Sequence, residues 1–278
     1  MNSIEQTISR MERMGANSRL LHKGMVFFLL CSLAFSLFVP GLISVSGSAA
    51  IVCLLLSGWQ RKQAEELLAQ SQTVEGLCSS MEDVKYLGRN VWTQEEFAGW
   101  KLLPIRLKGR NLLCQHGFSG YLGRNQAVGA EVTFHYEHAF HKGTYLFLNG
   151  TVLRCKSGIR GQNWLLLRKG LLEDMTESSF CREAGYQVGL TENTGLDDNY
   201  SLLCLPGSEL PTQPQLERIA DYVCRTDNLG AFRVDGNTVT LFLADQLYTS
   251  VLPAGKTTPE ILTANLLPEW DALLALLK

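Results

Sequence analysis

One stretch of the chain constrains its fold more than any other: residues 24–60 contain no charged side chain. As a single straight helix this stretch would extend about 55 Å at 1.5 Å per residue. A bilayer core is only about 30 Å thick and takes roughly 20 residues. Val39-Pro40-Gly41 interrupts the stretch near its middle, because proline removes a backbone donor and glycine tolerates a reversal. The sequence therefore predicts a transmembrane helical hairpin with two short spans, residues 20–39 and 43–59.

Two other interpretations of this stretch are disfavoured. A signal peptide has an apolar core of about 7–15 residues, whereas this run is longer and starts later. A buried hairpin of a soluble protein needs a polar face on its helices, and neither span offers one. Small residues within the spans either help the helices pack closely or reflect ordinary membrane-helix composition; they are Ser32, Ser36, Gly47, Ser57 and Gly58.

Basic residues flank the predicted hairpin, and the turn between its spans has none. They are Arg10, Arg13, Arg19 and Lys23 before the uncharged stretch, and Arg61 and Lys62 after it. Lys and Arg remain on the cytoplasmic side of membrane proteins. We therefore expect a multi-pass membrane protein, with both termini and the soluble part in the cytoplasm.

The formal net charge of −2 is the sum of two parts with opposite charge. Residues 1–62 hold six Lys or Arg and two acids, a balance of +4, so the remainder carries −6. The basic part suits an anionic lipid leaflet. The acidic remainder lacks the basic excess that neutralises phosphates, so the sequence predicts no nucleic-acid partner.

Eight cysteines are present, and none shows the CxxC spacing of a zinc or redox site. Most lie in apolar surroundings, as Cys204 and Cys224 do. We expect buried, reduced thiols that behave as small hydrophobic groups. This expectation agrees with a cytoplasmic location.

The remaining pattern predicts an α+β protein in four segments: a cytoplasmic N-terminal segment 1–19, the hairpin 20–60, a helical stalk 61–82 and a cytoplasmic domain 83–278. Residues 4–14 predict a short helix with Ile4, Ile8, Met11 and Met14 on one face. The domain reads as largely antiparallel strands, since short β-rich runs are bounded by glycine and asparagine. Asn149-Gly150 predicts a hairpin turn or a bulge, and Asp235-Gly236 predicts a second hairpin. Helices are expected at residues 175–184, 215–226 and 268–278.

The order of these features resembles a bacterial family of membrane-anchored proteins of unknown function, some members of which are labelled galanin. The resemblance spans about residues 20–255 and rests on short motifs after the two spans. These are Phe134-His135-Tyr136-Glu137-His138, the strand TYLFLNGTVLRC, Leu172-Glu173-Asp174 with Phe180, Tyr186-Gln187-Val188, and the closing segment LFLADQLYTSVLP. The resemblance implies a location in a bacterial inner membrane, and it implies no activity, cofactor or catalytic residue.

Three histidines form the one constellation with metal-ligand character. His135, His138 and His141 are spaced by three residues, and histidine is a common transition-metal ligand. On a strand His135 and His141 share a face while His138 points away, so a solvated strand end competes with a metal site. The Gly117–Gly123 repeat lacks a phosphate-loop lysine and reads as strand turns. No catalytic or cofactor-binding residue is predicted.

These observations favour a non-enzymatic membrane protein whose cytoplasmic domain binds a protein or a ligand. Its expected partners are the lipid bilayer and a protein partner or a second copy of the chain. One alternative is a membrane-tethered metal-dependent enzyme that uses the histidine array. Another is an accessory subunit of a membrane transport complex, in which the hairpin makes the functional contacts.

Overall fold

The computed structural model describes residues 2–38, 42–77, 81–103, 112–137, 145–171, 185–189, 194–244 and 270–277. It has an α+β architecture, as predicted, and divides into two compact units. One unit holds the two long helices of the hairpin. The other begins at Leu77 and holds the sheet with its flanking helices.

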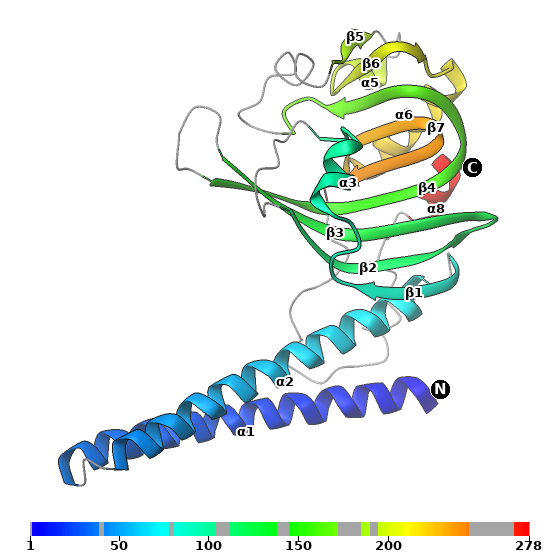
Figure 1. Cartoon of the computed structure of the whole chain (residues 1–278). Coiled ribbons are helices and arrows are strands. Elements are labelled where there is room, and N and C mark those ends of the chain that lie inside the picture. Colours follow the sequence, from blue (N-terminus) through cyan, green and yellow to red (C-terminus); the bar gives the residue numbers. More distant parts are fainter. Residues whose placement is uncertain are drawn as a thin grey trace. The chain divides into compact units, whose positions relative to one another are not determined.

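Helices α1 (Asn2–Phe38) and α2 (Ile43–Leu77) form an antiparallel pair (Figure 1). The predicted short helix and first span are one continuous helix, as are the second span and the start of the stalk. The stalk was predicted to reach residue 82, but α2 ends at Leu77 and Glu82 begins a strand. Single glycines such as Gly15 cost only about 1 kcal/mol inside a helix, so they do not end it.

The second unit is built on seven antiparallel strands in the order β1-β2-β3-β4-β6-β5, with β7 paired to β4. The strands are β1 (Glu82–Gly88), β2 (Leu112–Leu122), β3 (Asn125–Glu137), β4 (Tyr145–Arg168), β5 (Gln187–Gly189), β6 (Tyr200–Glu209) and β7 (Leu229–Leu243). Strand β1 was not predicted. Strands β2 and β3 are joined by a tight turn at Gly123, whose φ of +61° favours glycine.

Strand β4 organises the sheet because it has different partners along its length. Its first half lies between β3 and β7, and its second half lies between β7 and β6. Irregular pairing between Lys156 and Trp164 accompanies the bend of this strand, which is visible in Figure 1. Strands that bend in this way carry one sheet into two facing layers.

Both predicted hairpin turns in this region are wrong, although the alternative for Asn149-Gly150, a longer strand, is confirmed without the bulge. Asn149-Gly150 lies inside β4, where a Cβ on Gly150 would meet the Leu243 carbonyl oxygen at 2.3 Å and the Phe242 ring at 2.6 Å. Glycine at this position leaves room for the close approach of β7 to β4. Asp235-Gly236 lies inside β7, which pairs with β4 on both sides of Gly236.

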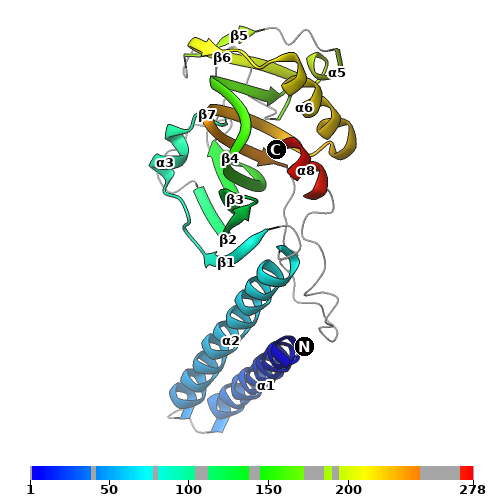
Figure 2. The ribbon, with the colours of Figure 1, turned by 90° about the vertical axis from the view of Figure 1, so that its right-hand side faces the viewer.

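Helices cover both faces of the central strands. Figure 2 shows α3 (Gln94–Gly99) on one side of β4 and β7, and α6 (Gln213–Thr226) with α8 (Trp270–Leu277) on the other. Helix α5 (Thr194–Asp197) is a single turn. Helices α6 and α8 match predictions, whereas the predicted helix 175–184 lies outside the described residues.

The core of this unit joins both layers of the sheet with α3. Phe97 of α3 lies 4.8 Å from Phe134, ring centre to ring centre, and Phe134 lies 6.2 Å from Phe242. The cluster consists of Phe97, Leu102, Leu103, Cys114, Val132, Phe134, Val152, Leu165, Leu167, Tyr186, Leu203, Ala231 and Phe242.

Candidate functional site

Hydroxyl groups join the two helices of the hairpin. The Ser18 and Ser57 hydroxyl oxygens lie 3.1 Å apart, and each lies within 3.2 Å of the other residue's main-chain carbonyl oxygen. Nearer the turn, the Ser32 and Ser46 hydroxyl oxygens lie 2.6 Å apart. Polar pairs of this kind between apolar helices are typical of membrane bundles.

Most small residues of the spans whose surroundings the structure describes lie between the two helices, in agreement with the close-packing interpretation. Ser32 and Ser57 make the contacts above, and a Cβ on Gly47 would lie 3.9 Å from the Ser32 hydroxyl. For Gly58 the other interpretation, ordinary membrane-helix composition, fits better, because nothing lies within 4 Å of its Cβ position and it faces away from the partner helix. The side chain of Ser36 lies outside the described residues.

Large apolar side chains cover the outside of the same part of the hairpin. Leu33 is 68% exposed and Leu55 is 66% exposed. Others more than one-third exposed are Val26, Phe27, Leu29, Leu30, Leu42, Ile43, Val45, Ile51, Val52, Leu54, Leu56 and Trp59. Water-soluble proteins rarely expose contiguous apolar patches of this size. Both helices are long and apolar enough to cross a membrane.

The end of the hairpin away from the turn has the opposite arrangement. Met11 and Leu68 are buried against each other, and the partly buried Ile4, Ile8 and Leu67 pack on them. The predicted apolar face of residues 4–14 is therefore confirmed for Ile4, Ile8 and Met11, whereas Met14 is not part of this cluster. The exposed Arg61 pairs with Glu65 at 2.8 Å. This end, residues 2–19 with 61–77, is organised like a water-soluble helix pair.

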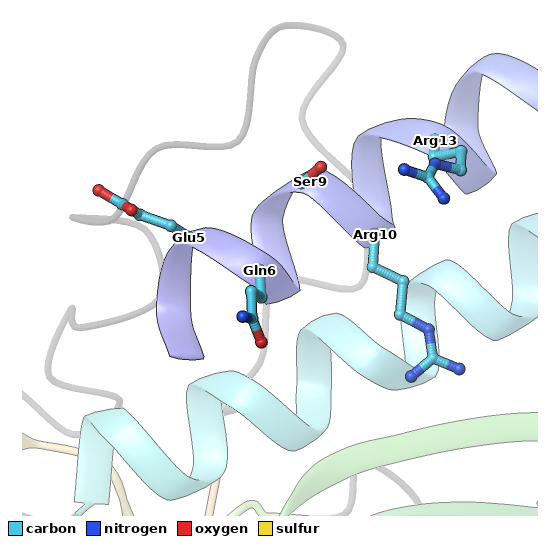
Figure 3. A pocket seen from close by; sticks show the side chains of 5 residues that line it. All are labelled: Glu5, Gln6, Ser9, Arg10 and Arg13. Atoms are coloured by element: carbon cyan, nitrogen blue, oxygen red, sulfur yellow. The ribbon is translucent and has the colours of Figure 1, made fainter. Parts of the chain in front are cut away.

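An open cavity of about 640 Å³ lies beside the first turns of α1. Its described lining residues are Glu5, Gln6, Ser9, Arg10 and Arg13, all from this one helix (Figure 3). Arginine and carboxylate side chains point in different directions around it. These five residues include two cations and one carboxylate, so the described part of the lining is polar and charged.

The structure describes one residue of the histidine array. His135 lies on β3, exposed, with its ring centre 4.5 Å from that of Phe147 on β4. His138 and His141 lie outside the described residues. Within the residues that the structure describes, no group of three His, Cys, Asp or Glu side chains could hold a metal ion. The metal site therefore stays a prediction from spacing.

A buried arginine marks a second candidate site, in the sheet. Arg233 on β7 is only 7% exposed. Its Nη1 donates to the Tyr186 hydroxyl at 2.7 Å, and that hydroxyl in turn donates to the Lys101 carbonyl oxygen at 3.4 Å. The nearest carboxylate oxygen of Asp235 lies 3.9 Å from Nη2, which is a weak ion pair.

A second arginine lies within electrostatic reach of the first. The Arg154 guanidinium on β4 lies 4.7 Å above the Trp100 ring, an attractive cation–π arrangement. Burial lowers the pKa of Arg154, and the positive charge of Arg233 adds to this effect against the opposing carboxylates of Asp235 and Glu96. No carboxylate among the described residues lies within ion-pair distance of Arg154.

We call Arg154, Arg233, Trp100 and Tyr186 the arginine pair site. Guanidinium groups bind carboxylates and phosphates bidentately, so the site suits an anionic group. Sequence reasoning missed it. The available signal was a cation in each of two mostly apolar strand segments, LFLNGTVLRC and LGAFRV.

The cysteines agree in part with the prediction of buried thiols. Burial raises the pKa of Cys114 to about 11, against the opposing hydrogen bond to the Trp92 carbonyl, and that of Cys155 to about 12. Cys224 is exposed, so the prediction is wrong for this residue. It lies on the outer face of α6, whose buried side includes Leu216 and Ile219.

No family model, curated protein or solved structure matches this chain. The function is therefore argued from the residues themselves.

Proposed function

We propose that the chain is a membrane-anchored binding protein. Its hairpin crosses the bilayer twice and holds the α+β domain at the cytoplasmic face of a bacterial inner membrane. The observation that carries the anchor is the inverted packing of the hairpin. Serine hydroxyls lie between the helices, while side chains such as Leu33 and Leu55 face outward.

Inverted packing supports a lipid environment for a physical reason. Apolar side chains have no drive to leave a hydrocarbon solvent, and polar groups there gain most from each other. In water both preferences reverse. The basic flanks and the uncharged turn support the proposed orientation.

The anchor is tested with the full chain expressed in a bacterial host. Alkaline carbonate washing of the membrane fraction separates integral from peripheral proteins, and we expect the chain to remain in the pellet. Reporter fusions at Ser44 and after Lys278 test the orientation, with a phosphatase active outside and a fluorescent protein active inside. A soluble chain contradicts the anchor, and an external C-terminus contradicts the orientation.

The α+β domain is proposed to bind a partner or ligand that carries an anionic group. The arginine pair site supports this proposal, because Arg154 is partly removed from water without a carboxylate beside it among the described residues. Titration of the full chain in detergent with inorganic phosphate, followed by tryptophan fluorescence, tests it. We expect a saturable change that Arg154→Gln removes and that Arg124→Gln, on the exposed β2–β3 turn, retains. No saturation in the wild type would contradict the proposal.

The family resemblance supports the proposed anchor alone, since it implies the order of two spans, a helical stalk and a cytoplasmic domain. The resemblance indicates no reaction. The histidine array remains the support for a metal-dependent alternative. Metal analysis of the full chain beside His135→Ala and His141→Ala variants decides it, since stoichiometric metal lost in both variants favours the enzyme.

A further inference from the structure

The register of the hairpin places positive charges of one helix beside an uncharged part of the other. A Cβ on Gly24 would lie 3.5 Å from the Cys53 sulfur, and Ser18 pairs with Ser57. Lys23 is therefore level with Cys53, and Arg19 is level with Leu56. On α2 the first basic residue is Arg61, so Lys23 lies about 12 Å closer to the turn at 1.5 Å per residue.

Three side chains of α1 that can donate hydrogen bonds lie on one face of the helix. Arg19, His22 and Lys23 are spaced i, i+3 and i+4, which places them together on a helix surface, and all three are exposed. No carboxylate among the described residues pairs with them. One turn further along the same face, Val26, Phe27 and Leu30 are exposed and apolar.

At one level of the hairpin, α2 exposes apolar side chains that favour hydrocarbon while α1 exposes cations that favour water or anionic groups. Leu54, Leu55 and Leu56 of α2 are 45–66% exposed at the level where α1 carries its cations. Tilting the hairpin cannot remove the conflict. A 12 Å offset across helices that pack 8–10 Å apart needs a tilt of roughly 50°, beyond the range of about 0–40° found for membrane helices.

The uncharged part of α1 is also short. Residues 24–38 span only about 22 Å, and residues 43–60 of α2 span about 27 Å, against about 30 Å for the hydrocarbon core. A phosphate group must therefore come toward Arg19 and Lys23, because a lone cation inside hydrocarbon is costly. Arginine binds phosphate bidentately and lysine adds a point charge.

We propose that Arg19, His22 and Lys23 bind the phosphate of an anionic phospholipid. The proposal rests on the proposed membrane anchor and deepens it. The lipid headgroup sits on the α1 side of the hairpin, deeper than the surrounding headgroups. It supplies the negative charge that the described residues lack at this depth, while its acyl chains cover Val26 and Leu30.

The test uses the full chain in vesicles of phosphatidylcholine with a small fraction of spin-labelled lipid. The measurement is the fraction of labelled phosphatidylglycerol immobilised by the protein, relative to labelled phosphatidylcholine. We expect wild type to prefer phosphatidylglycerol at least threefold. Arg19→Gln/Lys23→Gln is expected to bring the ratio close to one.

The matched control removes the same charge from the other helix. Arg61→Gln/Lys62→Gln takes away two cations near the membrane, one of which already pairs with Glu65. We expect this variant to keep most of the lipid preference. Equal losses in both double variants overturn the site in favour of general attraction by net charge, and so does a wild-type ratio near one. Failure of the wild type to enter vesicles overturns the anchor instead.

Discussion

The part of the hairpin nearest its turn, residues 18–38 with 42–59, and the α+β domain place polar and apolar side chains in opposite positions. Between helices α1 and α2 lie serine hydroxyls and glycine, and leucines face outward. In the domain, Phe134, Phe242 and Trp164 are fully buried. Burial of apolar side chains is favourable only where water is the alternative solvent. The buried aromatic side chains of the domain therefore suit water, and the outward leucines of the hairpin suit hydrocarbon.

The change of arrangement happens within one continuous helix. Toward its start, α1 buries Met11 against Leu68 as a soluble helix does. Beyond Ser18 it turns leucines outward and keeps hydroxyls inside. The position of this change, rather than a break in the helix, marks where the proposed membrane surface lies.

Truncating a buried aromatic of the domain is expected to have the largest effect. Phe242→Ala leaves a cavity beside Phe134 and costs about 3–5 kcal/mol of unfolding free energy. Denaturant unfolding in detergent, followed by the domain's tryptophan fluorescence, measures this loss. Phe27→Ala is the control, because Phe27 is 61% exposed on the hairpin. Comparable losses of unfolding free energy in both variants would contradict the difference in packing between the domain and the hairpin.

A charge on the outer face of the hairpin is expected to act strongly through the membrane. Leu30→Arg costs about 3 kcal/mol of insertion free energy in hydrocarbon, although Leu30 is 61% exposed in the structure. The fraction of chain resistant to carbonate extraction reports the effect. Ala16→Arg, on the same helix before the uncharged stretch, should change it little. An unaffected Leu30→Arg variant contradicts a lipid-facing surface.

Alkaline pH is expected to weaken the domain through its buried thiols. Burial raises the pKa of Cys155 to about 12 and that of Cys114 to about 11, from an ordinary value of 9.0. Above pH 9 the unfolded chain loses these protons while the folded chain keeps them, so stability falls as pH rises toward 12. Unfolding measured at several pH values shows the slope. Cys114→Ala/Cys155→Ala should flatten it, and an unchanged slope would assign the loss to other groups.

The smallest expected effect is at the contact between the helices. Ser57→Ala removes the hydroxyl that meets Ser18, and such hydrogen bonds average about 0.6 kcal/mol in membranes. Thermal stability of the full chain in detergent should fall slightly. Gly58→Ala is the neighbouring control, because Gly58 faces away from α1. An equal loss at both positions would argue against the observed helix register.

The hairpin could be predicted because it depends on composition alone. A charge-free stretch with proline and glycine at its middle needs no tertiary information. The continuity of α1 could not be predicted in this way. Gly15 reads locally as a break, yet contacts of Ile8 and Met11 with Leu68, and of Ser18 with Ser57, hold the helix together across it.

The sheet shows where local turn signals fail. Asn149-Gly150 has the residues of a hairpin turn, but Gly150 is required by the Phe242 ring that packs on it. That requirement comes from a strand about 90 residues away in the sequence. The arginine pair site depends equally on register, since Arg154 and Arg233 lie on different strands. Spacing along the chain carries no trace of it.

The most direct test of the central claim is the solvent around single residues of the hairpin. Spin labels placed at Leu30, Leu33 and Leu55 of the full chain in vesicles report collisions with oxygen, which concentrates in lipid, and with a water-soluble nickel complex. If the outer face of the hairpin lies in lipid, we expect frequent oxygen collisions and rare nickel collisions at these three positions. Collisions with either reagent should be rare at Ser32, which lies between the helices. Frequent nickel collisions at Leu30 and Leu55 would contradict it, because the outer face of the hairpin would then lie in water.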